Sequence, residues 1–410
     1  MASWTPIGSA FVFSVHQSGD PLPVGQIAIQ GNGFAFRYAN SWLERSTAFA
    51  VDPVNLPLSD QQYSSPKLWG GFEDGTPDNW GRRVLLATRS QHPQNEIEWL
   101  LAARGAGVGC LLYSASRSKL PSLHLPPTFE DLEQLLLATD QIQQGDSETA
   151  PELAKLLQYG SSMGGARPKV TVSYQGAEWI AKLARSDDLF NQPRAEYASL
   201  RMAHDAGIPT PVHELVEVAG RSVLLVKRFD RHDGLREHYL SAYATIHPFR
   251  MRVGDSDGPM SYLRIADVLK KVSDNATADM HDLYRRMVFN VLIGNSDDHL
   301  RNHGMLMNSP TTYRLSPAFD MLPHPGELGL QALIIGKDGR TSSIENVLSA
   351  CERFGVHPEQ ARKILAEIHE VTKHSADYFS RANMKSKDVD ILTSACSRLD
   401  STVAQIMGRV

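Results

Sequence analysis

The sequence contains few cysteines, and this scarcity excludes two kinds of small domain. Only Cys110, Cys351 and Cys396 occur among the 410 residues, and they lie far apart. They offer neither the close spacing of a zinc site nor the even number that a disulfide framework needs. We therefore expect a protein of the reducing cytoplasm.

Long apolar runs and a large charge of one sign are missing too. No uninterrupted apolar stretch approaches the ~20 residues that span a membrane. The sequence begins Met-Ala-Ser-Trp-Thr-Pro, without the basic and apolar regions of a signal peptide. The net charge of −5 argues against a chain built mainly to coat nucleic acid. We expect no membrane partner.

The remaining composition is that of an ordinary folded protein. Hydrophobic residues make up 42% of the chain and charged residues 21%. A chain of 410 residues is long enough to form two or three domains. Residues 11–15, 24–29 and 34–38 read as short strands separated by glycine turns, and helices are expected near residues 78 and 94–103. The Pro-rich segment 121–127 is a plausible domain boundary.

One stretch, residues 281–323, sets polar and acidic residues between apolar elements, which a fold avoids unless the acids have a role. Asp297 and Asn302 stand in the order Asp-x-x-x-x-Asn, and Asp320 follows a strand-like segment. Protein kinases use such a layout for a base that accepts the substrate's proton and for magnesium ligands. The short motif is common, so a solvated loop at a helix end is the alternative interpretation.

Lys182 lies between apolar neighbours on a predicted strand, where a charge needs a partner or a ligand. In kinases a strand lysine binds the nucleotide phosphates and pairs with a glutamate on the next helix. A helix is predicted from 194 to 206, and it carries Glu196 near its start. A lysine at a sheet edge with its ammonium in water is the alternative.

A glycine-rich loop precedes this strand. Residues 160–169 read Gly-Ser-Ser-Met-Gly-Gly-Ala-Arg-Pro-Lys, and glycines allow backbone amides to approach a phosphate. The loop matches neither the Walker A pattern nor Gly-x-Gly-x-x-Gly. By itself the loop favours a tight turn that leads into a hairpin over a phosphate cradle.

Four motifs occur together in one order: Gly-Gly-Ala-Arg-Pro-Lys at 164–169, Arg-Phe-Asp-Arg at 228–231, Asp-x-His-x-x-Asn at 297–302 and Leu-Ser-Pro-Ala-Phe-Asp at 315–320. In this respect the chain resembles the HipA family of bacterial serine/threonine kinases, the toxins of type II toxin–antitoxin modules. The resemblance covers nearly the whole chain. It implies an α+β fold with a two-lobed protein-kinase-like core, a small α+β N-terminal subdomain and a helical C-terminal lobe. The expected divisions are 1–120, 121–235 and 236–410.

The resemblance also implies roles for individual residues. Asp297 would be the general base, Asn302 and Asp320 would hold Mg²⁺, and Lys182 would contact the phosphates of ATP. Further nucleotide contacts are implied by position for Ser161, Ser162, Met163, Gly164, Gly165, Ala166, Lys169, Lys227, Phe229, Asp230 and His299. The autophosphorylated serine of the family aligns best with Ser162, with Ser161 adjacent.

The resemblance implies partners as well, and the sequence departs from the family at several positions. A translation component such as an aminoacyl-tRNA synthetase is the implied substrate, and a HipB-like helix-turn-helix antitoxin would neutralise the kinase and tether it to DNA. The glycine loop carries Arg167-Pro168 where many members have Gln-Glu, Asp298 replaces a common glycine, and Arg301 replaces a common lysine. These departures leave the substrate open.

Two other function classes compete with a kinase. The chain could be a nucleotide-binding pseudokinase that acts as co-repressor with a DNA-binding antitoxin. It could also be a metal-dependent phosphohydrolase that uses Asp297, His299, His303 and Asp320. In a kinase, His299 would instead brace the loop through hydrogen bonds.

Overall fold

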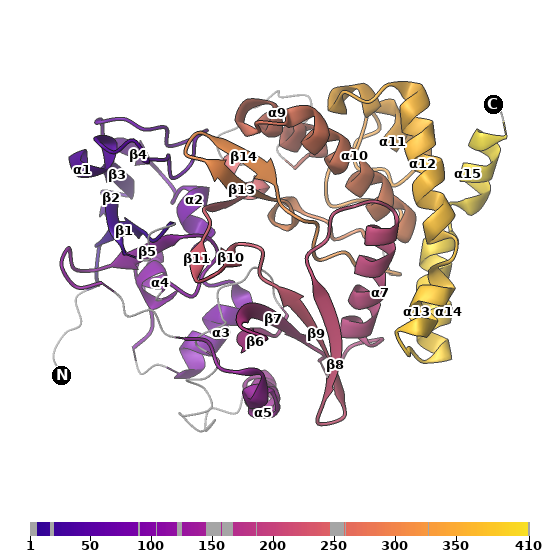
Figure 1. Cartoon of the computed structure of the whole chain (residues 1–410), viewed down its shortest axis with the longest axis horizontal. Coiled ribbons are helices and arrows are strands. Elements are labelled where there is room, and N and C mark those ends of the chain that lie inside the picture. The colour runs from indigo at the N-terminus through magenta and orange to yellow at the C-terminus, as the bar shows by residue number, and fades with distance from the viewer. Residues whose placement is uncertain are drawn as a thin grey trace.

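The computed structural model describes residues 6–16, 20–88, 91–103, 105–120, 125–144, 157, 167–185, 187–246, 258, 260–326 and 328–408. Three regions follow one another across Figure 1: an N-terminal sheet, a second sheet, and a mainly helical C-terminal part. The expected α+β class is therefore confirmed. The divisions at residues 120 and 235 stay a prediction.

The N-terminal region is built on a five-stranded antiparallel sheet with the order β4-β3-β2-β1-β5. Buried and exposed side chains alternate along the strands, so one face of the sheet points inward. Ile27 and Phe36 are paired and buried on that face, while their neighbours Gln26 and Arg37 are exposed. The three strands expected from the sequence are confirmed to within two residues at each end. The strands are β1 (Ser9–Ser14), β2 (Leu22–Gln30), β3 (Gly33–Tyr38), β4 (Tyr63–Ser65) and β5 (Leu111–Ser114), and the helices are α1 (Asn40–Leu43), α2 (Gly70–Glu73), α3 (Asn79–Thr88) and α4 (Glu96–Ala103).

The second sheet is antiparallel, with the order β6-β7-β9-β8. Gln175 and Gly176 both have positive φ, +49° and +73°, which suits the two-residue turn that joins β6 to β7. One side packs on α5, which directly follows η1 and the capping box of Thr128 and Asp131 at the start of η1, and α7 lies on β8 and β9. These elements are β6 (Lys169–Tyr174), β7 (Ala177–Leu183), β8 (His213–Val218), β9 (Arg221–Lys227), η1 (Phe129–Asp131), α5 (Leu132–Gln144) and α7 (Gln192–Asp205).

Two small sheets join these regions to the helical part. The strands β10 (Arg231–His232) and β11 (Leu235–Arg236) form a short hairpin. The strands β12 (Tyr239–Ser241), β13 (Gly304–Ser309) and β14 (Thr312–Leu315) form an antiparallel sheet. The loop with Asp297 leads into β13, and Asp320 follows β14. The paired strands β13 and β14 therefore connect the Asp297 loop to the Asp320 segment.

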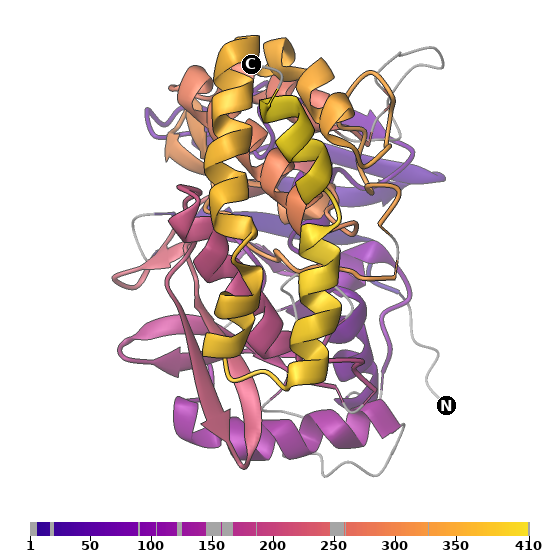
Figure 2. The same ribbon diagram turned by 90° about the vertical axis from the view of Figure 1, so that its right-hand side faces the viewer.

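The C-terminal helices pack around α10, most of whose residues are buried. Figure 2 shows α12 to α15 side by side along one face of the molecule. The sequence of residues 386–407 predicts one helix, and this prediction is wrong because the chain breaks between α14 and α15. The helices are α8 (Ala242–Ile246), α9 (Tyr262–Val272), α10 (Ala276–Ile293), η4 (Leu300–Asn302), α11 (Ile344–Ser349), η5 (Cys351–Phe354), α12 (Pro358–Thr372), α13 (Ser375–Arg381), α14 (Ser386–Ser397) and α15 (Asp400–Met407).

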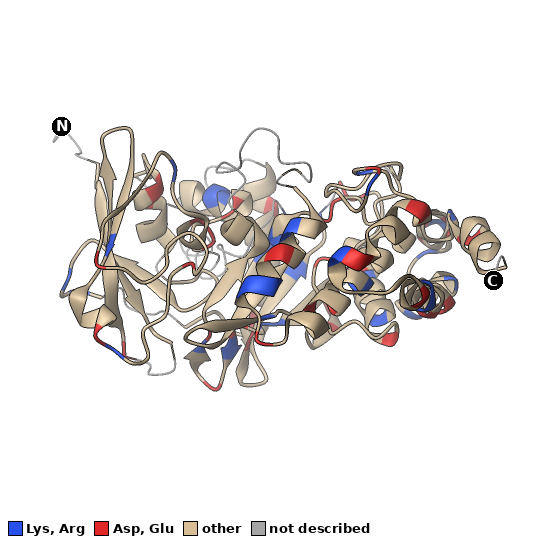
Figure 3. Ribbon diagram, turned by 90° about the horizontal axis from the view of Figure 1, so that it is seen from above, with Lys and Arg blue, Asp and Glu red and all other residues tan. Residues whose placement is uncertain are grey.

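Charged residues of both signs are spread over this fold. Among the described residues, Lys and Arg alternate with Asp and Glu along the length of the molecule (Figure 3). None of the helices in the described parts of the chain combines the length and the apolar character that a membrane span requires.

Candidate active site

The end of α10 positions the loop that carries Asp297. The helix stops at Gly294, whose φ of +74° gives the left-handed cap, and the N–H of Gly294 donates to the carbonyl oxygen of Asn290. The guanidinium of Arg398, at the break between α14 and α15, lies 2.6 Å from the carbonyl oxygen of Val291. A cation at this end is favourable for the helix dipole. Asp297 then lies exposed in the turn that follows.

Asp298 points the other way and anchors the loop from inside. The hydroxyl of Tyr262 donates to the Asp298 carboxylate, and Nε2 of His303 lies 3.0 Å from it. Nδ2 of Asn290 donates to the Tyr262 hydroxyl at 3.0 Å, and Nδ2 of Asn295 donates to Asn290 at 3.1 Å. These five residues are buried, so the loop is rigid beneath Asp297. From the sequence, Asp298 was noticeable only as a departure from glycine.

Lys182 joins the two lobes of the site. Its ammonium on β7 lies 2.5 Å from the carboxylate of Glu196 on α7 and 2.8 Å from that of Asp320. Burial by itself lowers the pKa of Lys182, but the two carboxylates outweigh burial and hold that pKa above its usual value. Partial desolvation of its carboxyl group raises the pKa of Asp320, but the ammonium of Lys182 outweighs this effect and brings that pKa well below the usual range. The sequence-predicted lysine, glutamate and aspartate are thus in contact.

The backbone at Asp320 is strained. Its φ is +59°, a left-handed conformation that costs an L-residue free energy. The carbonyl oxygen of Asp320 receives a long hydrogen bond of 3.5 Å from Asn295 Nδ2. The side chain is about half exposed, at 51%. Strain at an exposed acid is typical of functional positions, because it fixes where the carboxylate points.

Lys169 lies directly opposite Lys182 in the β6–β7 pair. Its buried ammonium lies 3.1 Å from the carboxylate of Asp78, just before α3 of the N-terminal region. The positive charge of Lys169 also contributes to lowering the pKa of Asp320, after burial and Lys182. Two cations and three acids therefore share one face of this hairpin.

The hinge residues at the end of β9 have different environments. Lys227 is exposed, and the Phe229 ring lies 5.6 Å from that of Phe319, which precedes Asp320. Asp230 is buried, and its carboxylate accepts hydrogen bonds from Arg228 at 2.8 Å, from Arg231 at 2.7 Å and from a backbone N–H. Phe229 thus lies near the segment of Asp320 and Lys227 is exposed, whereas the carboxylate of Asp230 belongs to an ion-pair network.

Asn302 and Asp320 fit the preference of Mg²⁺ for oxygen ligands, since they offer an amide oxygen and a carboxylate. Asn302 is 7% exposed, yet within the described residues its side-chain amide has no hydrogen-bond partner. His299 lies nearby: its carbonyl oxygen accepts from the Asn302 N–H at 2.9 Å. Its Nδ1 atom is buried without a partner among the described residues. Polar atoms left free in this way are suited to a ligand.

Two family models match the chain. The model for the HipA-like C-terminal domain covers residues 161–375, more than half of the chain, and the model for the HipA N-terminal domain covers residues 16–114. The chain belongs to the HipA family. A serine/threonine-protein kinase toxin HipA of Shewanella oneidensis is 20% identical over 328 residues, 73% of each chain. A protein of Haemophilus influenzae named as a kinase is 26% identical over 190 residues. The match covers 41% of this chain and 55% of that relative.

A solved structure gives the same fold. The HipA chain in a complex of HipA, HipB and operator DNA from Shewanella oneidensis superposes with a TM-score of 0.67 at 18% identity, covering 96% of this chain and 99% of that one. The expected two-lobed, kinase-like HipA fold is therefore confirmed. The glycine-loop residues Ser161, Ser162, Met163, Gly164, Gly165 and Ala166 lie outside the described residues.

The metal-centred alternative has no support in the geometry. In the described portion of the chain, no three His, Cys, Asp or Glu side chains converge to hold a metal ion. His303, one of the expected ligands, faces Asp298 in the interior instead. This arrangement weighs against a phosphohydrolase built on the Asp/His cluster.

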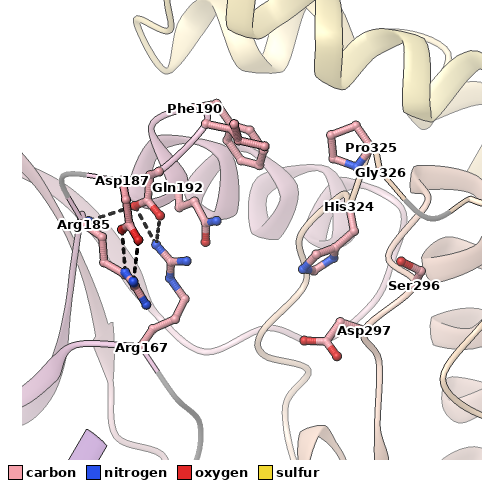
Figure 4. Close-up of a pocket in the computed structure, with 12 residues that line it drawn as sticks. Arg167, Arg185, Asp187, Phe190, Gln192, Ser296, Asp297, His324, Pro325 and Gly326 are labelled. Atoms are coloured by element: carbon pink, nitrogen blue, oxygen red, sulfur yellow. Dashed lines mark hydrogen bonds and ion pairs between the residues drawn. The ribbon is translucent and has the colours of Figure 1, made fainter.

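A cavity of about 520 Å³ opens beside Asp297 (Figure 4). Its walls come from the segment between β7 and α7 on one side and from the Asp297 turn and residues 324–326 on the other. Gln192, His324 and Arg167 face into it, and Arg167 is held by Asp188 at 2.6 Å. Lys182, Asn302 and Asp320 do not line this cavity. Asp297 therefore borders this cavity, whereas the lysine–acid cluster is not part of its lining.

Proposed function

We propose that this HipA-family chain is an ATP- and Mg²⁺-dependent protein serine/threonine kinase. The contact of Lys182 with both Glu196 and Asp320 is the observation that carries the proposal. A kinase needs this arrangement, because a lysine held by a helix glutamate aligns the phosphates while a nearby aspartate binds metal. Asp297 on a rigid, exposed turn supports the same reading.

Each residue has a role in the proposed transfer. Lys182 binds the phosphates of ATP, and Glu196 holds the ammonium in place. Asn302 and Asp320 would hold Mg²⁺, which neutralises charge on the phosphates. Asp297 accepts the proton of a serine or threonine hydroxyl as its oxygen bonds to the γ-phosphorus and ADP leaves.

The nucleotide base and the acceptor lie on different sides of this centre in our proposal. Lys227 and Phe229 contact adenine at the hinge, and Lys169 and the glycine loop contact the phosphates. The acceptor segment enters the cavity beside Asp297, because Asp297, the general base, lines that cavity and the lysine–acid cluster does not. Asp230 makes no direct nucleotide contact in this arrangement, because Arg228 and Arg231 occupy its carboxylate.

Regulation and partners are proposed from the family. Phosphorylation of Ser162, or of the adjacent Ser161, would place roughly −1.5 to −2 charges beside a site that must hold ATP phosphates, and would switch the kinase off. A HipB-like helix-turn-helix antitoxin would bind the kinase and tether it to DNA. The substrate would be a translation component such as an aminoacyl-tRNA synthetase, whose phosphorylation inhibits growth.

A transfer assay tests the proposal. The purified chain and Asp297→Ala are incubated with Mg²⁺ and labelled ATP, and peptides covering residues 159–169 are analysed by mass spectrometry. We expect phosphate on Ser161 or Ser162 of the wild type and none in the variant. ATP binding without transfer, in a chain whose loop carries no phosphate beforehand, would support the pseudokinase instead.

A further inference from the structure

The loop of the proposed active site is bound directly by the N-terminal region. Arg301 lies one residue before Asn302, and its guanidinium lies 3.2 Å from the Asp74 carboxylate and 3.3 Å from that of Glu73. Glu73 is the last residue of α2, and Asp74 follows it. An ion pair with two acids therefore joins segments that are more than 200 residues apart in the sequence.

Helix α8 completes this junction. The Arg301 guanidinium lies over the ring of Tyr243 at 3.9 Å, a favourable cation–π geometry. Asp74 also accepts hydrogen bonds from the N–H and the hydroxyl of Ser241, both at 2.7 Å, and thereby fixes the start of α8. The same buried carboxylate thus holds both α8 and the arginine of the loop.

Close packing prevents these segments from sliding past one another. A Cβ atom at Gly70 of α2 would collide with the Cα of Ala244 in α8, so the two helices touch through backbone. The N–H of Ala242 donates to the carbonyl oxygen of His303 at 2.8 Å, directly after the loop. Helix α2, helix α8 and the loop therefore form one packed unit.

We propose that Arg301 is a positioning residue that couples the N-terminal region to the phosphotransfer loop. In this view Arg301 does not contact nucleotide or acceptor; it holds Asn302 and Asp297 at the geometry that transfer requires. Small displacements of reacting groups reduce rates strongly. The N-terminal region is then a working part of the kinase. This inference rests on the proposed kinase function.

The test compares single-turnover transfer of labelled phosphate from ATP to the chain itself. Arg301→Met keeps the aliphatic stem on Tyr243 but removes the charge. We expect its transfer rate to fall at least ~10-fold, with the half-saturating ATP concentration unchanged, because the nucleotide contacts remain. Arg301→Lys keeps a charge toward the acids and should recover part of the rate.

Arg82→Met is the matched control. Arg82 also pairs with a glutamate, Glu96 at 2.7 Å, and lies over an aromatic ring, Trp99 at 4.7 Å, but it does not touch the loop. We expect this variant to transfer phosphate at the wild-type rate. Glu73→Gln, whose side chain is partly exposed, gives a milder version of the change should Arg301→Met fold poorly. Glu73→Gln should slow transfer. In the double variant with Arg301→Met, the loss of transfer rate should be smaller than the two single losses combined.

The outcomes separate the inference from the function on which it rests. A wild-type rate in Arg301→Met and Glu73→Gln, or an equal loss in Arg82→Met, would overturn the coupling role and leave the kinase intact. A wild-type chain that transfers no phosphate would overturn the proposed function, and the inference with it.

Discussion

The ammonium of Lys182 lies 2.5 Å from the Glu196 carboxylate, and the same ammonium lies 2.8 Å from Asp320. One cation therefore ties strand β7 to helix α7 and to the segment after β14. Its side chain is 19% exposed, so the charge is partly shielded from water without being sealed off. Such a lysine can exchange an acid partner for the phosphates of a nucleotide.

Replacing Lys182 tests this account of the site. Lys182→Met leaves Glu196 and Asp320 without their cation, so we expect phosphate transfer to fall by about 100-fold or more. The free energy of unfolding should fall by only about 1–3 kcal/mol, because Asp320 is half exposed and its charge is screened. Labelled-phosphate transfer and urea unfolding measure the two effects. A loss of stability without a loss of transfer would contradict the role in phosphate binding.

Two substitutions of Asp320 distinguish the effect of its strained backbone from the effect of its carboxylate. Asn tolerates the left-handed conformation at φ +59° better than Ala does. Asp320→Asn should therefore fold with nearly wild-type stability and lose transfer, whereas Asp320→Ala should lose roughly 1 kcal/mol more. Denaturant titration of both variants is the measurement. Equal stability of the two would show that the backbone at this residue carries no strain.

Asp230 should matter for folding and not for nucleotide affinity. Its carboxylate is buried between Arg228 and Arg231, whose charges outweigh burial and hold the pKa of Asp230 below its usual range. Asp230→Asn leaves two buried guanidinium groups short of a partner, and we expect a loss of about 3–5 kcal/mol in unfolding free energy. Calorimetric titration with ATP below the unfolding midpoint should give the wild-type Kd. A weaker Kd at unchanged stability would restore the direct contact that sequence position implied.

His238 should make the protein sensitive to acid. Burial, with a smaller effect of His16, lowers the pKa of His238 from 6.5 to about 3. Between these values the unfolded chain binds a proton that the folded chain does not, so the contribution of His238 to stability is lost as the pH falls from 6.5 toward 3. Within this window the slope of the unfolding free energy against pH approaches about 1.4 kcal/mol per pH unit.

The pH series needs a matched variant. His238→Gln can still form a hydrogen bond with the Tyr313 hydroxyl, which lies 3.0 Å from Nδ1 of His238. It should flatten the dependence of the unfolding free energy on pH between 6.5 and 3. A His238→Gln curve with the wild-type slope would show that other groups govern the acid sensitivity.

Several features of the site could be predicted from the sequence because they depend on local pattern. The apolar neighbours of Lys182 placed it on a strand, and the next helix began close to Glu196, so their pairing required only adjacent elements. The ordered motifs also indicated the family, which the family models confirmed.

Other features depend on contacts that the sequence does not encode locally. The pairing of Arg301 with Asp74 joins residues 227 positions apart, and no local pattern links them. Asp298 stood beside Asp297 in an acidic run, but only the fold turns one inward and the other outward. The helix predicted for 386–407 breaks because Arg398 turns to the carbonyl groups at the end of α10, a tertiary contact that overrides helix propensity.

Titration of the chain with ATP by calorimetry, with and without Mg²⁺ and on protein whose glycine loop carries no phosphate, tests the central claim most directly. The account predicts that the wild type binds ATP in the presence of Mg²⁺, and that Lys182→Met and Asp320→Asn each bind it far more weakly. Asp297→Asn should bind ATP like the wild type, because in our proposal the Asp297 carboxylate contacts the acceptor hydroxyl and not the nucleotide. A wild type that fails to bind ATP, or a Lys182→Met variant that binds it equally well, would contradict the account.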